Sequence, residues 1–320
     1  MSSDIVFSTK TTASYDKFSI VMYISEGFLI LLVNIFLAIK LFSHPNLRCQ
    51  KEFVVIGSCI VFDIFFGMTY FSAGVFRLIV ILKYEYFPLV SMFDCFSTIH
   101  NQLFIIITIM AGIQLFSTAI DRFICIFFPF FYIKLHHEYS YSIMFLPYLI
   151  LIPLWIPGLT GAYENRLVKN FTMNCLLNQS ITVNWYVYYR TIRIVCTILC
   201  IFIYVPIFVK MCLSIQNHTK LVPGSTKNNK RLLSMTKTVA LITGSTFILF
   251  TIPDLITYFY PFVNSNVMYL MNLNKGVVNI LIFMTTQKTL RQLMFPTKIQ
   301  EIQSEAFSSR KKNTTVVQIG

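Results

Sequence analysis

Seven long apolar segments constrain the fold of this chain more than any other feature of its sequence. Each is long enough to cross about 30 Å of hydrocarbon as a helix that rises about 1.5 Å per residue. None shows the strict alternation of a barrel strand. The sequence therefore predicts an all-α seven-transmembrane helix bundle, with spans near residues 18–42, 53–82, 96–120, 141–160, 186–213, 238–260 and 267–286.

The composition excludes a water-soluble domain of this size. Charged side chains make up 12% of the 320 residues, against roughly 25% in soluble domains, and hydrophobic side chains make up 56%. So much apolar surface exceeds what one aqueous core buries, and lipid is the expected solvent. The eight cysteines form no CxxC pair and no catalytic constellation is evident. We therefore predict no enzyme activity, no cofactor and no metal site.

The positions of Lys and Arg between the spans predict the orientation, because cytoplasmic segments retain positive charge. Of the 26 basic residues, 17 lie in the segments after spans one, three, five and seven, whereas five lie in the opposite set of segments. We expect residues 1–17 to be an extracellular N-terminus, residues 18–286 to form the membrane domain, and residues 287–320 to be cytosolic. Within the last segment, residues 287–295 are basic and amphipathic, which predicts a short eighth helix lying on the membrane.

The formal net charge of +13 does not point to nucleic acid as a partner. Its basic residues follow the bilayer rule and are not interleaved with exposed aromatic side chains that could stack on bases. Most of the positive charge is therefore a consequence of topology.

Three polar residues lie at comparable depth inside apolar spans: Asn34, Asp63 and Asn279. A carboxyl group in mid-bilayer costs several kcal/mol unless it is neutral, paired or hydrated. The three side chains could form a hydrated cluster that holds a cation, or they could be unrelated residues packed by helix contacts.

A motif at the end of the third span carries a family resemblance. Asp121, Arg122 and Phe123 stand there, and Pro129 follows seven residues after the arginine. This resembles the Asp-Arg-Tyr…Pro signature of rhodopsin-like G-protein-coupled receptors, with Phe in place of Tyr. In that family the motif lies at the cytosolic end of helix three and serves activation and G-protein coupling. The resemblance implies the same role here.

Two later spans carry degenerate versions of the same family's motifs. The sixth span keeps Phe247 and Pro253 of Phe-x-x-x-Trp-x-Pro but has Thr251 in place of Trp. The seventh span keeps Asn279 of Asn-Pro-x-x-Tyr and ends the motif with Phe283. Proline removes a backbone hydrogen bond, so the sixth helix should be kinked near its proline.

Within the family, the chain looks most like the nematode serpentine chemoreceptors of the srsx class. The run Phe62-Asp63 through Gly74-Val75-Phe76-Arg77 and the junction at Ile120–Phe123 carry this resemblance. It implies a chemosensory receptor for a small molecule or odorant that signals through a heterotrimeric G protein at the plasma membrane, including that of sensory cilia. A seven-span ligand-gated channel and a peptide receptor remain as alternatives.

The resemblance also implies a disulfide between Cys95, at the outer start of helix three, and Cys175, in the second outer loop. Both would face the oxidising compartment, where a disulfide persists. Cys95 lies farther from Arg122 than is usual in the family, so either the helix begins later here or the bridge is shifted. Two sequons, at Asn170 and Asn178, fall in the same outer loop and predict glycosylation there.

Counting from Arg122 and Pro253 gives the positions that match the family's ligand cavity, which should be apolar with sparse polar anchors. Asp254 and Lys275 are opposite charges in neighbouring spans, so we expect them to pair with each other or to contact a polar ligand. Arg190 and Arg193 are weaker candidates, because arginines at helix ends usually extend toward the interface. The predicted ligand-binding residues are Phe104, Ile105, Thr108, Thr251, Asp254, Leu255, Tyr258, Tyr269 and Lys275.

Overall fold

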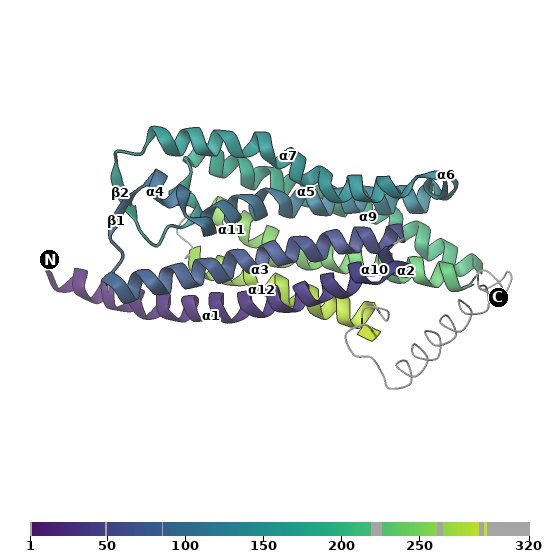
Figure 1. Cartoon of the computed structure of the whole chain (residues 1–320), viewed down its shortest axis with the longest axis horizontal. Coiled ribbons are helices and arrows are strands. Elements are labelled where there is room, and N and C mark those ends of the chain that lie inside the picture. The colour runs from purple at the N-terminus through teal and green to yellow at the C-terminus, as the bar shows by residue number, and fades with distance from the viewer. Residues whose placement is uncertain are drawn as a thin grey trace, which may run out of the picture.

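The chain folds as an elongated bundle of helices, shown by a computed structural model that describes residues 2–48, 50–84, 86–218, 226–260, 265–287 and 291–292 (Figure 1). Among these residues, seven helical segments are long and apolar enough to span a membrane. The all-α seven-helix bundle of a multi-pass membrane protein is therefore confirmed. The spans are Lys17–Ser43, Lys51–Tyr84, Ile99–Phe127, Glu138–Glu164, Val183–Lys210, Thr236–Phe259 and Val267–Thr286.

The helices and strands follow one another without large insertions. In chain order the elements are α1 (Ser2–Ser43), α2 (Pro45–Arg48), α3 (Lys51–Tyr84), β1 (Leu89–Ser91), α4 (Met92–Ser97), α5 (Ile99–Phe127), α6 (Pro129–Lys134), α7 (His137–Glu164), β2 (Lys169–Thr172), α8 (Leu177–Ser180), α9 (Val183–His218), α10 (Thr226–Thr246), the π-helical turn η1 (Phe247–Thr251), α11 (Ile252–Phe259) and α12 (Ser265–Thr286). Helix α1 begins at Ser2, so the helix of the first span also includes the polar residues that precede the predicted span.

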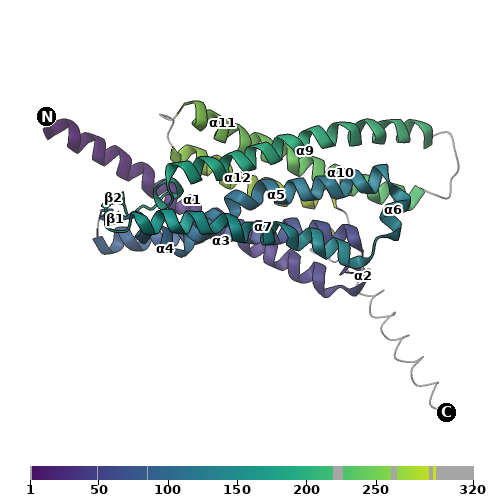
Figure 2. The ribbon, with the colours of Figure 1, turned by 90° about the horizontal axis from the view of Figure 1, so that it is seen from above.

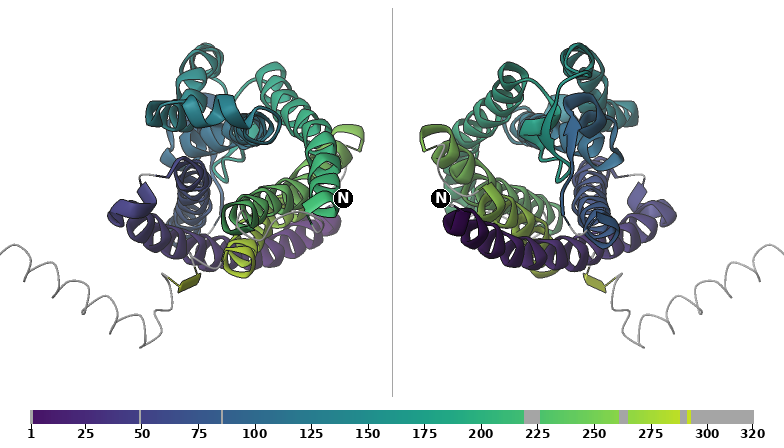
Figure 3. Two further views of the ribbon diagram at one scale, coloured as in Figure 1. Left: turned by 90° about the vertical axis from the view of Figure 1, so that its right-hand side faces the viewer. Right: turned by 90° about the vertical axis from the view of Figure 1, so that its left-hand side faces the viewer.

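Helix α5 lies at the centre of the bundle and packs against α3, α7 and α9 (Figures 2 and 3). In its most apolar stretch 83% of the residues are buried, against 22% in that of α7 at the edge. Large apolar side chains on the outer helices point away from the bundle, including Leu82, Leu149 and Phe208. Such outward apolar faces are expected where lipid is the solvent.

The two ends of the bundle differ in structure. At one end, strands β1 and β2 pair antiparallel beside α4 and α8, and Cys95 is bonded to Cys175; we call this the disulfide end (Figure 1). At the opposite end lie α2 and α6, together with Arg122 in the last turns of α5; we call this the Arg122 end (Figure 1). The start of α1 lies at the disulfide end.

The third span begins later than its apolar run suggests. The expected span over 96–120 is divided by Thr98, whose extended backbone ends α4, and α5 then runs on to Phe127. The Thr98 hydroxyl donates to the Cys95 carbonyl at 2.7 Å, and the Asn101 side chain donates to the same oxygen at 2.9 Å. The Cys95 carbonyl, which lies at the break, is thus satisfied locally.

The sixth span loses its regular α-helical pattern next to its proline, in the region where the sequence predicted a kink. The Ile252 amide donates to the Phe247 carbonyl, a bond of π-helical spacing, and Pro253 follows inside the first turn of α11. Because proline has no N–H, the preceding turn loses an α-helical bond and rearranges. Single π turns of this kind occur frequently at functional sites.

Helices α1 and α3 approach each other through two glycines. A β-carbon on Gly27 would lie 2.6 Å from the Phe71 amide nitrogen, and one on Gly67 would lie 2.7 Å from the Leu31 amide nitrogen. Both atoms belong to backbones, which cannot give way as a flexible side chain can. Small residues at a contact let helices pack closely in a membrane.

We therefore expect Gly67→Val to push α1 away from α3 and to cost about 1–3 kcal/mol of stability, the usual range for overpacking. Gly244→Ala is the matched control, because a β-carbon on Gly244 would meet nothing within 4 Å. It should leave the melting temperature of purified protein unchanged or raise it. Equal melting temperatures for the Gly67 variant and wild type would contradict the close contact.

Candidate functional site

A cavity of about 200 Å³ lies inside the bundle toward the disulfide end. Its walls come from α3, α5, α8, α9, η1, α11 and α12, so it joins elements that are far apart in the sequence. They combine aromatic rings with a few polar groups, as ligand-binding cavities usually do. The lining residues are Tyr70, Phe104, Ile107, Thr108, Leu177, Asn178, Tyr186, Arg190, Arg193, Phe250, Asp254, Thr257, Met268, Tyr269 and Asn272.

Four of the predicted ligand-binding residues line this cavity: Phe104, Thr108, Asp254 and Tyr269. The other five lie elsewhere. Ile105 is fully buried in the core and Thr251 is buried in η1, whereas Leu255 is half-buried on α11.

The prediction for Tyr258 is wrong, because its side chain is 55% exposed on the outer surface. The inward face of α11 carries Asp254 and Thr257, and the next residue along a helix is turned by about 100°. Counting along the sixth span from Pro253 was therefore not sufficient to place Tyr258 in the cavity.

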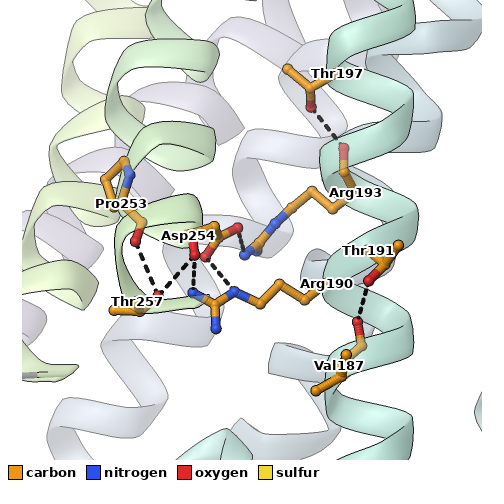
Figure 4. A network of polar contacts seen from close by, with 8 residues as sticks. All are labelled: Val187, Arg190, Thr191, Arg193, Thr197, Pro253, Asp254 and Thr257. Carbon is orange, nitrogen blue, oxygen red and sulfur yellow. Dashed lines mark hydrogen bonds and ion pairs between the residues drawn. The ribbon is translucent and has the colours of Figure 1, made fainter. Parts of the chain in front are cut away.

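Asp254 is held by two arginines of α9 rather than by Lys275 (Figure 4). Arg193 donates through Nη2 to Oδ2 of the carboxylate, and Arg190 Nε lies 3.3 Å from Oδ1. Arg190 also donates to the backbone carbonyl of Asp254, which accepts from the Thr257 hydroxyl at 3.1 Å as well. The expected pair between Asp254 and Lys275 is wrong, because Asp254 faces α9 whereas Lys275 faces α3.

The two arginines come from one face of α9, since residues three apart in a helix are neighbours. Their exposed fractions are 7% for Arg190 and 6% for Arg193, so they do not extend to the interface as expected of arginines near a helix end. Arg193 also lies over the Phe250 ring, 4.2 Å from its centre. The sequence signal that could have found them is two arginines at this spacing inside an apolar span, with a buried aspartate available in another span.

Lys275 pairs with Asp63 in a second buried cluster. The Lys275 ammonium lies 3.6 Å from Asp63 Oδ1, and the Asn279 amide donates to both oxygens of that carboxylate at 3.1 and 3.3 Å. Ser245 donates to the Asn279 carbonyl oxygen at 3.3 Å. The structure thus brings Asp63 and Asn279 together, which agrees in part with the first of the two interpretations of the sequence, and the positive charge beside them belongs to a lysine of the chain.

Asn34 does not complete this cluster in the way expected. It is fully buried on α1, but its amide nitrogen donates to the Ile30 carbonyl of its own helix at 2.9 Å. A hydrated site for a free cation at Asn34, Asp63 and Asn279 is therefore not the arrangement found, because Lys275 already neutralises the carboxylate.

Phe250 connects the two charged clusters. Arg193 lies over its ring, the Lys275 ammonium lies 6.0 Å from its ring centre, and the ring centre of Phe66 in α3 lies 6.1 Å away. Phe250 belongs to the π-helical turn, so a change in that turn would move a side chain that both clusters contact. Cations over aromatic faces are attracted by the ring quadrupole.

At the Arg122 end, Arg122 forms an ion pair with the adjacent Asp121, and both side chains are buried. Two further nitrogens of the guanidinium, Nε and Nη1, have no hydrogen-bond partner within the described part of the chain. Burial, reinforced by the Asp121 carboxylate, raises the pKa of the nearby Tyr132 hydroxyl in α6 above its ordinary value.

The other residues of the predicted activation motifs lie where helices meet. Phe123 stacks on Phe127 at 4.5 Å between ring centres, and Pro129 starts α6. Phe247 begins η1 and Pro253 is buried at the start of α11. Phe283 is fully buried in the core near the Arg122 end.

The predicted disulfide is confirmed: the sulfurs of Cys95 and Cys175 are bonded, 80 residues apart in the sequence. The later start of α5 accounts for the unusual spacing between Cys95 and Arg122, because Cys95 lies on the separate helix α4. The bridge ties α4 to the segment after β2 and so holds α8, which lines the cavity.

The two predicted glycosylation sites, Asn170 on β2 and Asn178 on α8, are exposed at the disulfide end. Glycosylation itself stays a prediction. The predicted eighth helix over 287–295 lies mostly outside the described residues, although the Arg291 amide donates to the Gln287 carbonyl with helical spacing.

No protein-family model and no curated protein matches this chain. The resemblance to rhodopsin-like receptors therefore stays a prediction from the sequence. The function has to be inferred from the cavity, the two charged clusters and the Asp121–Arg122 pair.

Proposed function

We propose that this chain is a rhodopsin-like G-protein-coupled receptor for a small molecule, with its disulfide end outside the cell and its Arg122 end in the cytosol. The observation that carries the proposal is the placement of a ligand-sized cavity and a buried Asp121–Arg122 pair toward opposite ends of one seven-helix bundle. A chemosensory role at the plasma membrane of sensory cells, cilia included, and glycosylation of the outer loop at Asn170 and Asn178 belong to the same proposal.

The proposed mechanism is a conformational switch without chemistry. A ligand in the cavity contacts Asp254 and Phe250, which lie on either side of the π-turn residue Thr251. A rearranged turn changes the direction of α10, whose far part reaches the Arg122 end. Outward movement of α10 then frees Arg122 from Asp121 to meet the G protein.

Phe250 is the physical link in this mechanism, because it contacts both Arg193 of the ligand cavity and the cluster around Lys275. A ligand that displaces Arg193 therefore acts on the packing of α12 and α3 through one ring. Interiors packed this tightly switch between discrete arrangements and do not deform continuously.

A ligand-gated channel of seven spans is the alternative that topology separates most directly. Such a channel would be similar to the insect odorant receptors, which have the N-terminus inside the cell. An N-terminal epitope tag that is stained on intact cells supports the receptor, and one that is stained only after permeabilisation supports the channel. A peptide receptor is disfavoured by the small cavity, since sites for drug-sized ligands measure about 300–1,000 Å³.

Loss of Arg122 tests the coupling role in cells. We expect Arg122→Ala to abolish the second-messenger response to odorants when it is compared with wild type at equal surface expression. Because this change leaves the buried Asp121 carboxylate without its partner, the double variant Arg122→Ala with Asp121→Asn tests the same loss of response without an unpaired buried charge. Arg166→Ala is the matched control, since Arg166 is exposed at the disulfide end beside Tyr163. A full response from the Arg122 variant at equal surface expression would remove Arg122 from the mechanism.

A further inference from the structure

The formal charges of the residues that line the cavity do not sum to zero. They are Arg190, Arg193 and Asp254, so two positive charges face one negative charge and one positive charge is left over. Three other buried cations in the described part of the chain are engaged elsewhere: Lys275 pairs with Asp63, Arg122 pairs with Asp121, and Arg77 donates to the Asn174 carbonyl at 3.1 Å and lies over Tyr23. The surplus charge therefore belongs to the cavity.

Hydrogen-bonding groups in the cavity are also left unused. Arg193 Nε is buried and has no hydrogen-bond partner among the described residues, and the same is true of the Asn272 side-chain oxygen. A guanidinium carries five N–H donors, and Asp254 accepts only some of those that Arg190 and Arg193 offer. Figure 4 shows both arginines reaching from α9 to the same carboxylate.

The uncharged residues that line the cavity, together with its volume, indicate the size and polarity of the rest of the ligand. Five aromatic residues line the cavity, and Thr108, Thr257 and Asn272 add hydroxyl and amide groups. A volume of about 200 Å³ lies below the usual range of about 300–1,000 Å³ for drug-sized ligands. The aromatic residues are Tyr70, Phe104, Tyr186, Phe250 and Tyr269.

We infer that the ligand of this cavity is a small organic monoanion, a carboxylate carrying a compact apolar or aromatic tail. This rests on the proposed function in one respect, that the cavity is the ligand site. An unbalanced charge in a low-dielectric interior is costly, so a single negative charge that enters is strongly stabilised. A carboxylate matches the planar fork of a guanidinium, whereas an amine is repelled by the surplus charge.

Matched ligands test this on the wild-type protein. The probes are benzoate and 3-phenylpropanoate, each compared with its primary amide and with its corresponding amine, and the readout is the melting temperature of purified receptor in detergent. We expect at least one carboxylate to raise the melting temperature in a concentration-dependent manner, while its amide and amine do not. Equal or larger shifts with the amides or amines, or no shift with any carboxylate, would overturn the inference.

Arg193 variants test the position of the anion. Arg193→Gln leaves Arg190 and Asp254 as a balanced pair, so this variant should fold while its affinity for the carboxylate falls by about tenfold or more, the equivalent of one charge-assisted hydrogen bond. Arg193→Lys keeps the charge and should recover part of the affinity. Thr191→Ala is the control, because Thr191 is exposed on the same helix and bonds only within it in Figure 4. Unchanged affinity in a folded Gln variant would place the anion elsewhere and contradict the assignment.

The binding assay needs no G protein, so the proposed ligand class and the proposed receptor function can be refuted independently of each other. Carboxylate binding without any G-protein response would uphold the ligand class and refute the receptor mechanism. A G-protein response driven by neutral or cationic compounds alone would refute the ligand class and uphold the receptor.

Discussion

Replacing Lys275 by Met is expected to remove nearly all folded receptor from the cell surface. Asp63 would then lie in the bundle as an uncompensated charge, since Lys275 and Asp63 are only 2% and 1% exposed. Breaking a buried ion pair by removing one partner costs about 3–5 kcal/mol, a large fraction of the stability of most proteins. Surface staining and the melting temperature of purified protein measure the loss.

The double variant Lys275→Met with Asp63→Asn should recover most of the folded protein. It removes both charges and keeps an amide that can bond to Asn279, and neutral replacements of buried pairs are often well tolerated. Asn274→Ala serves as the control on the same helix, because Asn274 is exposed and bonds to the Leu270 carbonyl within α12. If the double variant were as damaged as the single one, the pair would not be the reason for the loss.

Asp254→Ala should lower the stability of the receptor as much as Lys275→Met does. Here two buried positive charges lose their negative partner, whereas Lys275→Met leaves a buried negative charge alone. Asp254→Ala would leave Arg190 and Arg193 side by side without their carboxylate, in a site where each is less than 10% exposed. The cost should again be about 3–5 kcal/mol, because like charges buried together repel each other and lose their shared partner. Surface staining and thermal melting of the variant are the measurements.

The variant with Arg190→Met, Arg193→Met and Asp254→Leu should fold again, because apolar side chains of similar volume replace the whole charged group. Its cavity would no longer favour an anion. Normal melting of Asp254→Ala alone would mean that water or another group satisfies the arginines, and the description of this cluster would be wrong.

The helical architecture was predictable from the sequence because it depends on local properties. A run of about 20 apolar residues determines a span wherever its neighbours lie, and the seven predicted spans differ from the observed ones by only a few residues at most ends.

The partners of the buried charges were not predictable in the same way. Asp254 and Lys275 lie in neighbouring spans and each needs an opposite charge, but four cations lie inside or at the ends of spans. The rotation of each helix about its own axis decides which of them meet, and hydropathy does not report rotation within a span. The π-helical turn adds one residue to a helical turn just before Asp254, which changes the faces that regular α-helical spacing would give.

Nucleotide exchange on purified G proteins tests the central claim most directly. The receptor is reconstituted in lipid vesicles with heterotrimers of each class, and GTP binding is followed with and without the carboxylate that raises its melting temperature. Faster exchange on at least one heterotrimer, lost in Arg122→Ala and retained in Arg166→Ala, is the expected result. Exchange at the rate of empty vesicles for every heterotrimer, or a ligand-dependent ionic conductance in the same vesicles, would contradict the account and favour a channel.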